Sequence, residues 1–364
     1  MKKILIIAGT RPEAIKLIPV YFALREEFDA QLISTGQHRE MLKQIFDFFQ
    51  IIPQHALNTM VQNQSLAEIT GSLFSSLSKI MEIGKPSLAI VQGDTTTAMV
   101  GAMVSYYHQI PVAHVEAGLR SHNIYSPFPE EVNRRIITQI AELNFAPTKS
   151  AADNLQGFKN VHIVGNTIVD SLRLALEKVE MNDCYETRFP FILQGKEIVL
   201  ITAHRRESFG DGIRNICEAV KLLASKYPSL QFVYPVHLNP HVKNNVHSFL
   251  GKIASVFLID PVNYDEMVYL MKAAKIIMTD SGGVQEEAPS LGVPLVVMRD
   301  VTERPEGIEA GCAVLGGTNA EGIVRAFEEV YLDAQKYEVM SHAANPYGDG
   351  KSSQRIATII RNFL

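Results

Sequence analysis

Cysteine, long apolar runs and excess positive charge are all scarce in this sequence of 364 residues. Its three cysteines are odd in number and far apart, which argues against a disulfide framework or a zinc site and favours reduced thiols in the cytoplasm. No apolar segment approaches the roughly 18 residues that cross a bilayer, and residues 4–8 are too few for a signal peptide. With 34 Lys and Arg against 39 Asp and Glu, the chain is a poor candidate for a nucleic-acid partner.

Several cofactor motifs are missing as well. The absence of a G-x-G-x-x-G stretch argues against a nicotinamide or flavin site, and neither a G-x-x-x-x-G-K-[ST] P-loop nor a G-x-S-x-G elbow occurs. No spacing of His, Asp or Glu demands a metal ion. The sequence therefore predicts a protein without a bound cofactor or a dedicated metal site, although a cleft of carboxylates with a diphosphate could bind Mg²⁺ loosely.

Short apolar runs alternate with helix-like stretches from end to end. We expect strands at residues 4–8, 30–35, 87–92, 110–115, 197–202, 230–235, 255–260, 274–279 and 294–298. These runs are continuously apolar, as in parallel strands covered on both faces. The pattern predicts an α/β protein of two Rossmann-like, doubly wound domains with a cleft between them. We place the domains at residues 1–166 and 167–350, and expect a last helix, residues 351–364, to pack back onto the first domain.

One strand-to-helix turn is the most informative segment of the chain. Residues 279–294 read TDSGGVQEEAPSLGVP, and a helix is expected directly behind Gly282 and Gly283. Glycines let a backbone approach a ligand closely, and the N–H groups of a helix start favour an anion. Glu286 and Glu287 suit the vicinal hydroxyls of a ribose. The segment indicates a binding site for a nucleotide or sugar nucleotide. The alternative is a tight strand-to-helix turn with solvated glutamates and no ligand.

Charged residues follow the strands of the first domain. Arg11 and Lys16 come after the first strand and could clamp an anion, although for this motif taken alone a capped helix with an extended Lys16 is the better explanation. Asp94 could cap the next helix or face the cleft. Glu116 follows a strand with no helix to cap, which makes a purely structural role harder to argue.

Two glutamates open a later helix behind Pro127 and Pro129. Glu130 and Glu131 complement the helix dipole and could form surface salt bridges with the arginines four residues on. Carboxylates that share a cleft push their pKa values apart, so that one site can hold an acid and a base. The acidic candidates of this domain are Asp94, Glu116 and Glu130.

Cations follow the strands of the second domain. His204, Arg205 and Arg206 stand together after one strand, which is a strong signal for an anion. His237 follows the next strand, and Arg304 lies beyond the last.

Nine motifs of the chain form a recognisable series. They are GTRPEAIK (9–16), QGDTTT (92–97), HVEAGLRS (114–121), SPFPEEVNR (126–134), HRRESFG (204–210), YPVHLNP (234–240), DSGGVQEEAPSLG (280–292), TERPE (302–306) and NPYGDG (345–350). Through them the chain resembles the non-hydrolysing UDP-N-acetylglucosamine 2-epimerases over nearly its whole length. The resemblance implies the GT-B arrangement of two domains, a homodimer, and interconversion of UDP-GlcNAc and UDP-ManNAc without NAD for cell-surface polysaccharide precursors.

The resemblance also implies roles for individual residues. Acid/base chemistry falls to Asp94, Glu116 and Glu130, with no decision on which acid does which. The diphosphate and leaving group are held by Arg11, Lys16, Arg134 and the catalytic residue His204. Phosphate is bound by Ser281, Gly282 and Gly283, the ribose hydroxyls by Glu287, and the nucleotide or sugar end by Arg304.

The chemistry of the substrate narrows the mechanism. The C2 proton of this sugar is not α to a carbonyl, so either a nicotinamide oxidises C3 first or UDP leaves by elimination. The missing dinucleotide fingerprint and the many anion-binding candidates favour anti-elimination of UDP to a bound 2-acetamidoglucal, followed by re-addition of UDP after protonation on the other face of C2.

In bacterial members of this family UDP-GlcNAc also acts as an activator at a second site. The matching positions are Gln37, Glu131, Arg205 and His237. Asn63 and Glu40 depart from the Arg and Gln of some members, which bears on regulation more than on catalysis. Gln92 and Ala8, the residue before the first motif, also depart from the family pattern. We expect neither to touch a proposed catalytic group.

Four other functions share parts of this pattern. An epimerase of another UDP-N-acetyl sugar is the nearest, and a hydrolysing epimerase disagrees with GTRPEAIK. A GT-B glycosyltransferase would need an acceptor, and a non-catalytic binding module would have no use for three acids.

Overall fold

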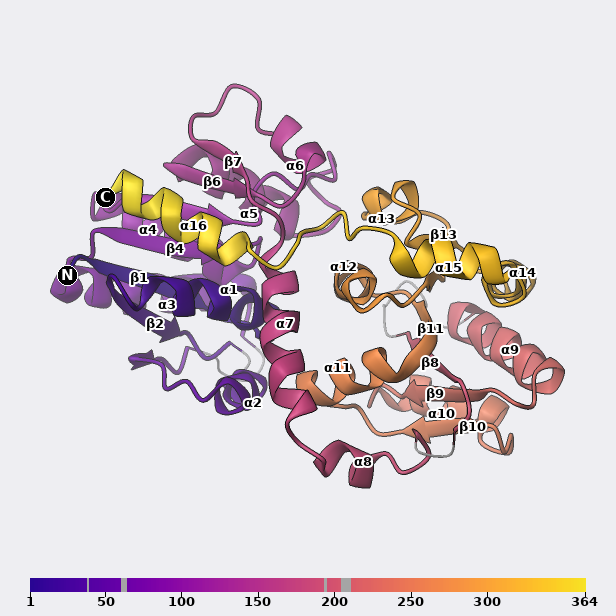
Figure 1. Ribbon diagram of the computed structural model, residues 1–364. Helices are drawn as coiled ribbons and strands as arrows, with labels where there is room; N and C mark the ends of the chain where they lie inside the picture. The colour runs from indigo at the N-terminus through magenta and orange to yellow at the C-terminus, as the bar shows by residue number, and fades with distance from the viewer. Residues whose placement is uncertain (38, 60–63, 193–194, 204–210) are drawn as a thin grey trace. The chain divides into compact units, whose positions relative to one another are not determined.

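The computed structural model describes residues 1–37, 39–59, 64–192, 195–203 and 211–364. It divides into two compact units: unit 1 is Met1–Leu174 with Gly348–Leu364, and unit 2 is Ala175–Tyr347. The division falls inside helix α7 (Thr167–Glu180), whereas the sequence placed a domain boundary just before that helix. Each unit contains one parallel sheet with helices packed on it (Figure 1), so the predicted α/β class is confirmed.

The sheet of unit 1 has the strand order β3-β2-β1-β4-β5-β6-β7. Its strands are β1 (Lys3–Ala8), β2 (Asp29–Ser34), β3 (His55–Ala56), β4 (Leu88–Gln92), β5 (Val112–Val115), β6 (Leu143–Ala146) and β7 (Val161–Ile163). Its helices are α1 (Arg11–Leu24), α2 (Arg39–Phe49), α3 (Leu66–Gly84), α4 (Thr96–Tyr107), α5 (Glu130–Ile140), α6 (Lys149–Asp153), the first part of α7 and α16 (Ser352–Phe363).

The sheet of unit 2 has the order β10-β9-β8-β11-β12-β13. Its strands are β8 (Ile198–Thr202), β9 (Gln231–Pro235), β10 (Val256–Ile259), β11 (Ala274–Thr279), β12 (Leu295–Val297) and β13 (Ala313–Leu315). Its helices are α8 (Cys184–Arg188), α9 (Asp211–Lys226), α10 (Pro240–Leu250), α11 (Tyr264–Ala273), α12 (Gly282–Glu287), the 3₁₀ helix η3 (Ala288–Leu291), α13 (Pro305–Glu309), α14 (Ala320–Tyr331) and α15 (Ala334–His342).

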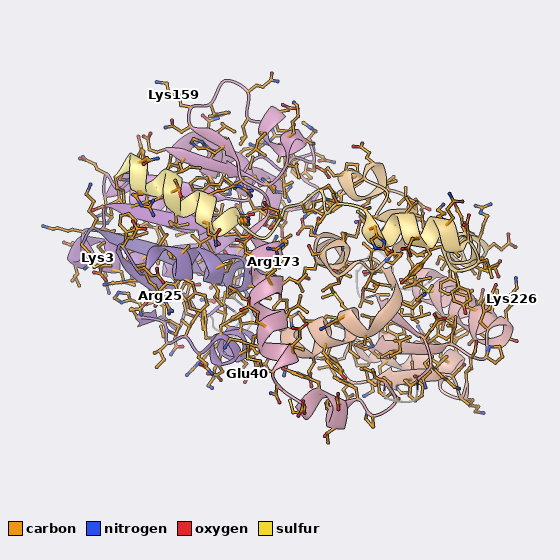
Figure 2. The ribbon with its side chains drawn as sticks, viewed as in Figure 1. Lys3, Arg25, Glu40, Lys159, Arg173 and Lys226 are labelled. Atoms are coloured by element: carbon orange, nitrogen blue, oxygen red, sulfur yellow. The ribbon has the colours of Figure 1, made fainter. Side chains whose placement is uncertain are left out.

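Central strands are buried on both faces, which is why they read as unbroken apolar runs. Ile4 to Ala8 of β1 and Val199 to Ile201 of β8 have no exposed surface. Every strand predicted from an apolar run is present. On the outside of unit 2, Lys226 at the end of α9 (labelled in Figure 2) contacts Glu328 of α14, with 2.5 Å between Nζ and Oε1.

The last helix packs on unit 1, beside α1 (Figure 1). Its first turn is capped by a side chain from α7, because Asp170 accepts hydrogen bonds from the backbone N–H groups of Ser352 (3.2 Å) and Ser353 (2.8 Å). Asp170 is itself buried. A carboxyl group at a helix N-terminus satisfies N–H groups that have no partner within the helix. In the described part of the chain, helices long and apolar enough to cross a membrane are absent.

A close approach between β1 and α4 depends on a glycine. A Cβ atom on Gly9 would lie 2.2 Å from Oγ1 of Thr97 and 2.7 Å from Oγ1 of Thr35. By contrast, a Cβ on Gly71, in α3, would meet nothing within 4 Å. The loop after β1 can therefore sit against the start of α4 only when residue 9 has no side chain.

We predict opposite effects of alanine at these two glycines. Gly9→Ala should lower the free energy of unfolding by about 1–3 kcal/mol, since an overpacked core must shift to make room. Gly71→Ala should raise it by roughly 0.5–1 kcal/mol, because alanine in a helix interior loses less backbone entropy than glycine. Urea unfolding followed by circular dichroism measures both. A Gly9→Ala protein as stable as the wild type would contradict the close packing.

Candidate active site

The strand order of unit 1 locates its binding edge. The chain runs outward in one direction through β1, β2 and β3 and in the other through β4 to β7, so the order reverses between β1 and β4. Ligands of doubly wound sheets bind outside the carboxyl ends of the strands at such a reversal. Arg11 opens α1 shortly after β1, Asp94 lies in the loop after β4, and Glu116 lies in the loop after the adjacent β5. These three predicted site residues therefore lie at one edge of the same sheet.

Asp94 is a carboxylate paired with a cation and does not cap α4. The N-cap of α4 is Thr95, whose Oγ1 accepts a hydrogen bond from the Ala98 N–H at 3.0 Å. Oδ2 of Asp94 instead contacts Nε of Arg134 at 2.8 Å and Nη2 at 2.6 Å. The side chain of Asn133 donates to the backbone carbonyl of Asp94 at 2.8 Å. Two side chains of α5 therefore hold this acid, one at its backbone and one at its carboxylate.

Glu116 is held at the same edge by two donors. Nζ of Lys16, in α1, lies 2.5 Å from its Oε2, and the side-chain amide of Gln92 donates to the same oxygen. The backbone of Glu116 is left-handed, with φ of 63°. This conformation is uncommon for a residue with a side chain and is often retained at functional positions. The expectation that Gln92 touches no proposed catalytic group was wrong, because its side-chain amide, at the end of β4, donates a hydrogen bond to Glu116.

The two glutamates that open α5 have different surroundings. Glu131 is fully buried and accepts from the Ser121 N–H at 2.9 Å and from Nε of Arg135 at 2.9 Å. Burial raises the pKa of the Glu131 carboxyl, but these hydrogen bonds and the arginine charges lower it overall. Oε2 of Glu130 is buried with no hydrogen-bond partner in the described part of the chain. Arg134 contacts Asp94 and Glu131 rather than pairing with Glu130.

Glu13 is a further site residue that the sequence analysis did not single out. It is 1% exposed, and Oε2 accepts from the N–H groups of Gly9 (3.1 Å) and Thr10 (2.7 Å). Oε1 accepts from the Thr95 hydroxyl at 2.6 Å. Burial raises the pKa of Glu13 to about 7, against the lowering effect of these donors. The spacing T-x-x-E of a capping box was the available signal.

His114 supports the same edge from β5. It is fully buried, and burial lowers its pKa to about 4, so the ring is neutral at pH 7. Its Nε2 lies 2.7 Å from the carbonyl oxygen of Gly93, which accepts, so this nitrogen carries the ring proton. Nδ1 is buried without a hydrogen-bond partner among the described residues. The ring therefore holds the residue immediately before Asp94.

The corresponding edge of unit 2 lies where β8 and β11 meet. His204 and Arg205, which follow β8 in the sequence, lie outside the described residues. After β11, Ser281 is the N-cap of α12, so Gly282 and Gly283 are the first two residues of the helix. The expectation that the helix begins behind the glycines was wrong. A helix that includes both glycines places their N–H groups among those left unbonded in a first turn.

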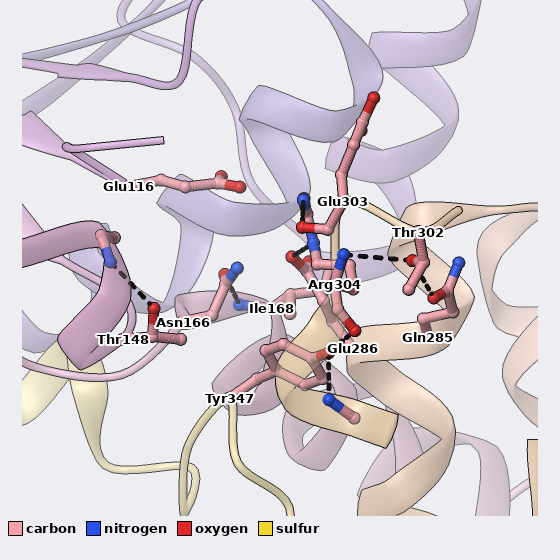
Figure 3. A network of polar contacts seen from close by, with 12 residues as sticks. Glu116, Thr148, Asn166, Ile168, Gln285, Glu286, Thr302, Glu303, Arg304 and Tyr347 are labelled. Carbon is pink, nitrogen blue, oxygen red and sulfur yellow. Dashed lines mark hydrogen bonds and ion pairs between the residues drawn. The ribbon is translucent and has the colours of Figure 1, made fainter. Parts of the chain in front are cut away.

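The acidic residues of α12 are paired within unit 2. Nε of Arg304 lies 2.5 Å from Oε1 of Glu286 (Figure 3), and the Tyr347 hydroxyl donates to the carbonyl oxygen of Arg304 at 3.1 Å. Oε1 of Glu287 accepts from the Tyr264 hydroxyl at 2.9 Å. Burial first, and then the neighbouring carboxylate, raise the pKa of Tyr264 well above its usual value. The hydroxyl therefore stays a donor.

Two residues assigned to a second site are also placed. Oε1 of Gln37 accepts from the Thr97 hydroxyl at 3.0 Å, beside the reversal point of the unit 1 sheet. His237 is exposed after β9, where Nδ1 accepts from the Asn239 N–H at 3.1 Å. In the part of the chain that is described, no three His, Cys, Asp or Glu side chains are grouped to hold a metal ion.

Comparison with known proteins gives a consistent result. A family model described as UDP-N-acetylglucosamine 2-epimerase matches residues 22–361. The chain is 44% identical to the UDP-N-acetylglucosamine 2-epimerase of Campylobacter jejuni, over 99% of this chain and 97% of that protein. The epimerase of Neisseria meningitidis bound to UDP-GlcNAc superposes with a TM-score of 0.92 at 43% identity, over 99% and 100% of the two chains. The Methanocaldococcus jannaschii epimerase in complex with UDP-GlcNAc and UDP has a TM-score of 0.83 at 36% identity, over 99% of each.

The raised pKa of Glu13 predicts a pH-dependent stability. Its pKa is about 7 in the folded protein and 4.5 when unperturbed. Between these values the unfolded chain releases the proton while the folded chain keeps it, so stability falls as pH rises. The slope approaches about 1.4 kcal/mol per pH unit. Glu13→Gln cannot ionise, and its free energy of unfolding should fall less steeply over this range.

The measurement is urea unfolding of both proteins at several pH values from 4.5 to 7. Glu68→Gln serves as the control because Glu68 is an exposed glutamate in the same capping position of α3. A difference between wild type and Glu13→Gln that does not change with pH would contradict the prediction.

Proposed function

Because this chain belongs to the UDP-N-acetylglucosamine 2-epimerase family, we propose that it inverts C2 of UDP-GlcNAc by eliminating UDP and adding it back. The product is UDP-ManNAc, a precursor for cell-surface polysaccharide. The observation that carries the proposal is the pair of acids at the carboxyl edge of the unit 1 sheet, each in contact with a cation: Asp94 with Arg134 and Glu116 with Lys16.

The proposed reaction needs one base, one acid and a stabilised leaving group. The base removes the proton from C2, the C–H electrons form the C1=C2 double bond, and the C1–O electrons leave with UDP. The bound intermediate is 2-acetamidoglucal. UDP then adds back at C1 while an acid protonates C2 from the opposite face. Stabilisation of the departing diphosphate supplies the largest effect, and a placed proton donor or acceptor contributes typically ~10²–10⁴-fold.

Within unit 1, the acids and cations have complementary proposed roles. Lys16 and Arg134 each hold an acid in position and present the positive charge that a diphosphate oxygen attracts. Glu130 carries a buried carboxylate oxygen that has no hydrogen-bond partner among the described residues, which supports its inclusion with the acids that reach substrate. Asp94, Glu116 and Glu130 share the acid and base steps, without an assignment of each.

Within unit 2, we propose that Ser281, Gly282 and Gly283 bind phosphate through backbone N–H groups. Glu287 would accept from the ribose hydroxyls, with its carboxylate oriented by Tyr264. Arg304 would support the nucleotide, with its guanidinium oriented by Glu286. No dinucleotide cofactor enters this scheme.

Solvent deuterium at C2 is the decisive measurement. UDP-GlcNAc incubated in D₂O with the pure protein and no acceptor should gain one deuterium at C2, in both epimers, because the proton is exchanged while the glucal intermediate is bound. NMR and mass spectrometry follow the exchange. A glycosyltransferase would leave the substrate unchanged, and a hydrolysing epimerase would release free ManNAc.

Two variants sharpen this experiment. Asp94→Asn should slow the exchange by about 10²–10⁴-fold, since the amide cannot carry the proton. Asp47→Asn, which removes an exposed carboxylate paired with Lys43 on α2, should leave it unchanged. Exchange that continues at the full rate in Asp94→Asn would remove Asp94 from the chemistry.

We also propose a homodimer with an activating site for UDP-GlcNAc near Gln37, Glu131, Arg205 and His237. Conversion of UDP-ManNAc alone should then be slow and should accelerate when a trace of UDP-GlcNAc is added. Initial rates by NMR, with and without the trace, test this. A full rate without the trace would contradict the activating site.

A further inference from the structure

Glu13 connects two loops that are far apart in the sequence. Its Oε2 caps α1 by accepting from the N–H groups of Gly9 and Thr10, and its Oε1 accepts from the hydroxyl of Thr95 at 2.6 Å. The same hydroxyl oxygen accepts from the N–H of Ala98, at the start of α4. A hydroxyl has one hydrogen and can also accept. Thr95 therefore caps α4 as an acceptor and uses its one hydrogen to donate a hydrogen bond to Glu13. One buried carboxylate therefore joins the caps of two helices.

The other capping boxes of the described chain do not join two helix caps. Glu68 accepts from the N–H and hydroxyl of Ser65 within its own helix start, at 2.7 Å each, and is exposed. Glu266 accepts from the N–H of Asn263 and from the exposed Nε of Arg188 at 3.2 Å, which belongs to α8 and caps no helix start. A capping glutamate is ordinarily a solvated surface group. Glu13 is buried, and because burial disfavours the charged carboxylate it raises the pKa of this side chain. A buried glutamate at this position suggests a role beyond capping α1.

The connected loops flank Asp94. Thr95 follows Asp94 directly, and Gly9 packs against Thr97 so closely that a Cβ has no room. From this short loop the carboxylate of Asp94 contacts two nitrogens of Arg134, Nε and Nη2. A displacement of Thr95 would therefore move Asp94 with it.

We propose that Glu13 is a positioning residue, which sets the location of the Asp94 carboxylate by accepting the hydrogen of the Thr95 hydroxyl. The inference rests on the proposed function for the role of Asp94 in proton transfer. Catalytic groups need to be held within about 0.5 Å of their working geometry, and an error of about 1 Å can cost on the order of 10²-fold in rate. Glu13 itself touches no substrate in this scheme.

The kinetic test uses the two ends of the link. Glu13→Gln has a single acceptor oxygen, which cannot serve both the Thr95 hydroxyl and the N–H groups of Gly9 and Thr10, and Thr95→Val removes the hydroxyl. Each should lower kcat by about 10–100-fold while KM changes less than about twofold, because binding groups stay in place. Thr95→Ser restores the hydroxyl and should recover most of kcat. Glu68→Gln, the matched capping variant, should keep the wild-type kcat.

The double variant Glu13→Gln/Thr95→Val distinguishes a link from two separate defects. If both residues act through one hydrogen bond, the double variant should be no slower than the slower single variant. Losses of kcat that multiply, or a kcat in Glu13→Gln equal to that in Glu68→Gln, would overturn the inference.

A crystal structure of Thr95→Val gives a readout that does not depend on activity. The Asp94 carboxylate should move away from Arg134 by more than about 0.5 Å, the tolerance of a working site. An unmoved carboxylate would overturn the inference even if the rate had fallen. A wild-type protein that leaves UDP-GlcNAc unchanged would instead refute the proposed function, and the displacement of Asp94 would still decide the role of Glu13.

Discussion

Acidic side chains at the carboxyl edge of the unit 1 sheet, of which Glu13 and Glu116 are buried and Asp94 is half-buried, need donors from other elements, and the rest of this edge is arranged around that need. A carboxylate removed from water is costly unless hydrogen bonds and an opposite charge compensate it. Asp94 receives its donors from α5, and Glu116 receives them from α1 and β4. Glu13 receives them from the loop after β1 and from Thr95. The loops after β1, β4 and β5 and the start of α5 therefore form one interdependent structure.

This arrangement explains why the cations of unit 1 have two uses. Lys16 and Arg134 were expected as an anion clamp, and the structure places each against an acid. A cation beside a carboxylate compensates its charge and, in the same place, offers positive charge to an arriving diphosphate. Arg135 pairs with the buried Glu131, which Arg134 also contacts at 3.4 Å, and so stabilises the start of α5. Arg134 therefore connects Asp94 to the buried start of this helix.

The strands that could be predicted are those buried on both faces. Their apolar runs are continuous, and residues such as Asp94 and Glu116 follow them at the expected edge. The strands β3, β6, β7 and β13 were missed. β3 has two residues, and β6 carries the buried polar side chain of Asn144, so neither gives a long apolar run. Glu13 could have been recognised from its capping spacing, whereas the contact of Gln92 with Glu116 leaves no trace in either sequence neighbourhood.

From the sequence alone come the α/β class, the positions of the buried strands and the list of charged residues that follow them. These depend on local periodicity and on the rule that parallel strands present their carboxyl ends together. The tertiary structure alone decides which cation meets which acid, that Thr95 rather than Asp94 caps α4, and that Glu13 reaches across to Thr95. The reason is physical: partners that are separated by 82 or 100 residues meet only after the strand order has formed, and a side chain's neighbours then depend on distances of a few ångströms that no local pattern encodes.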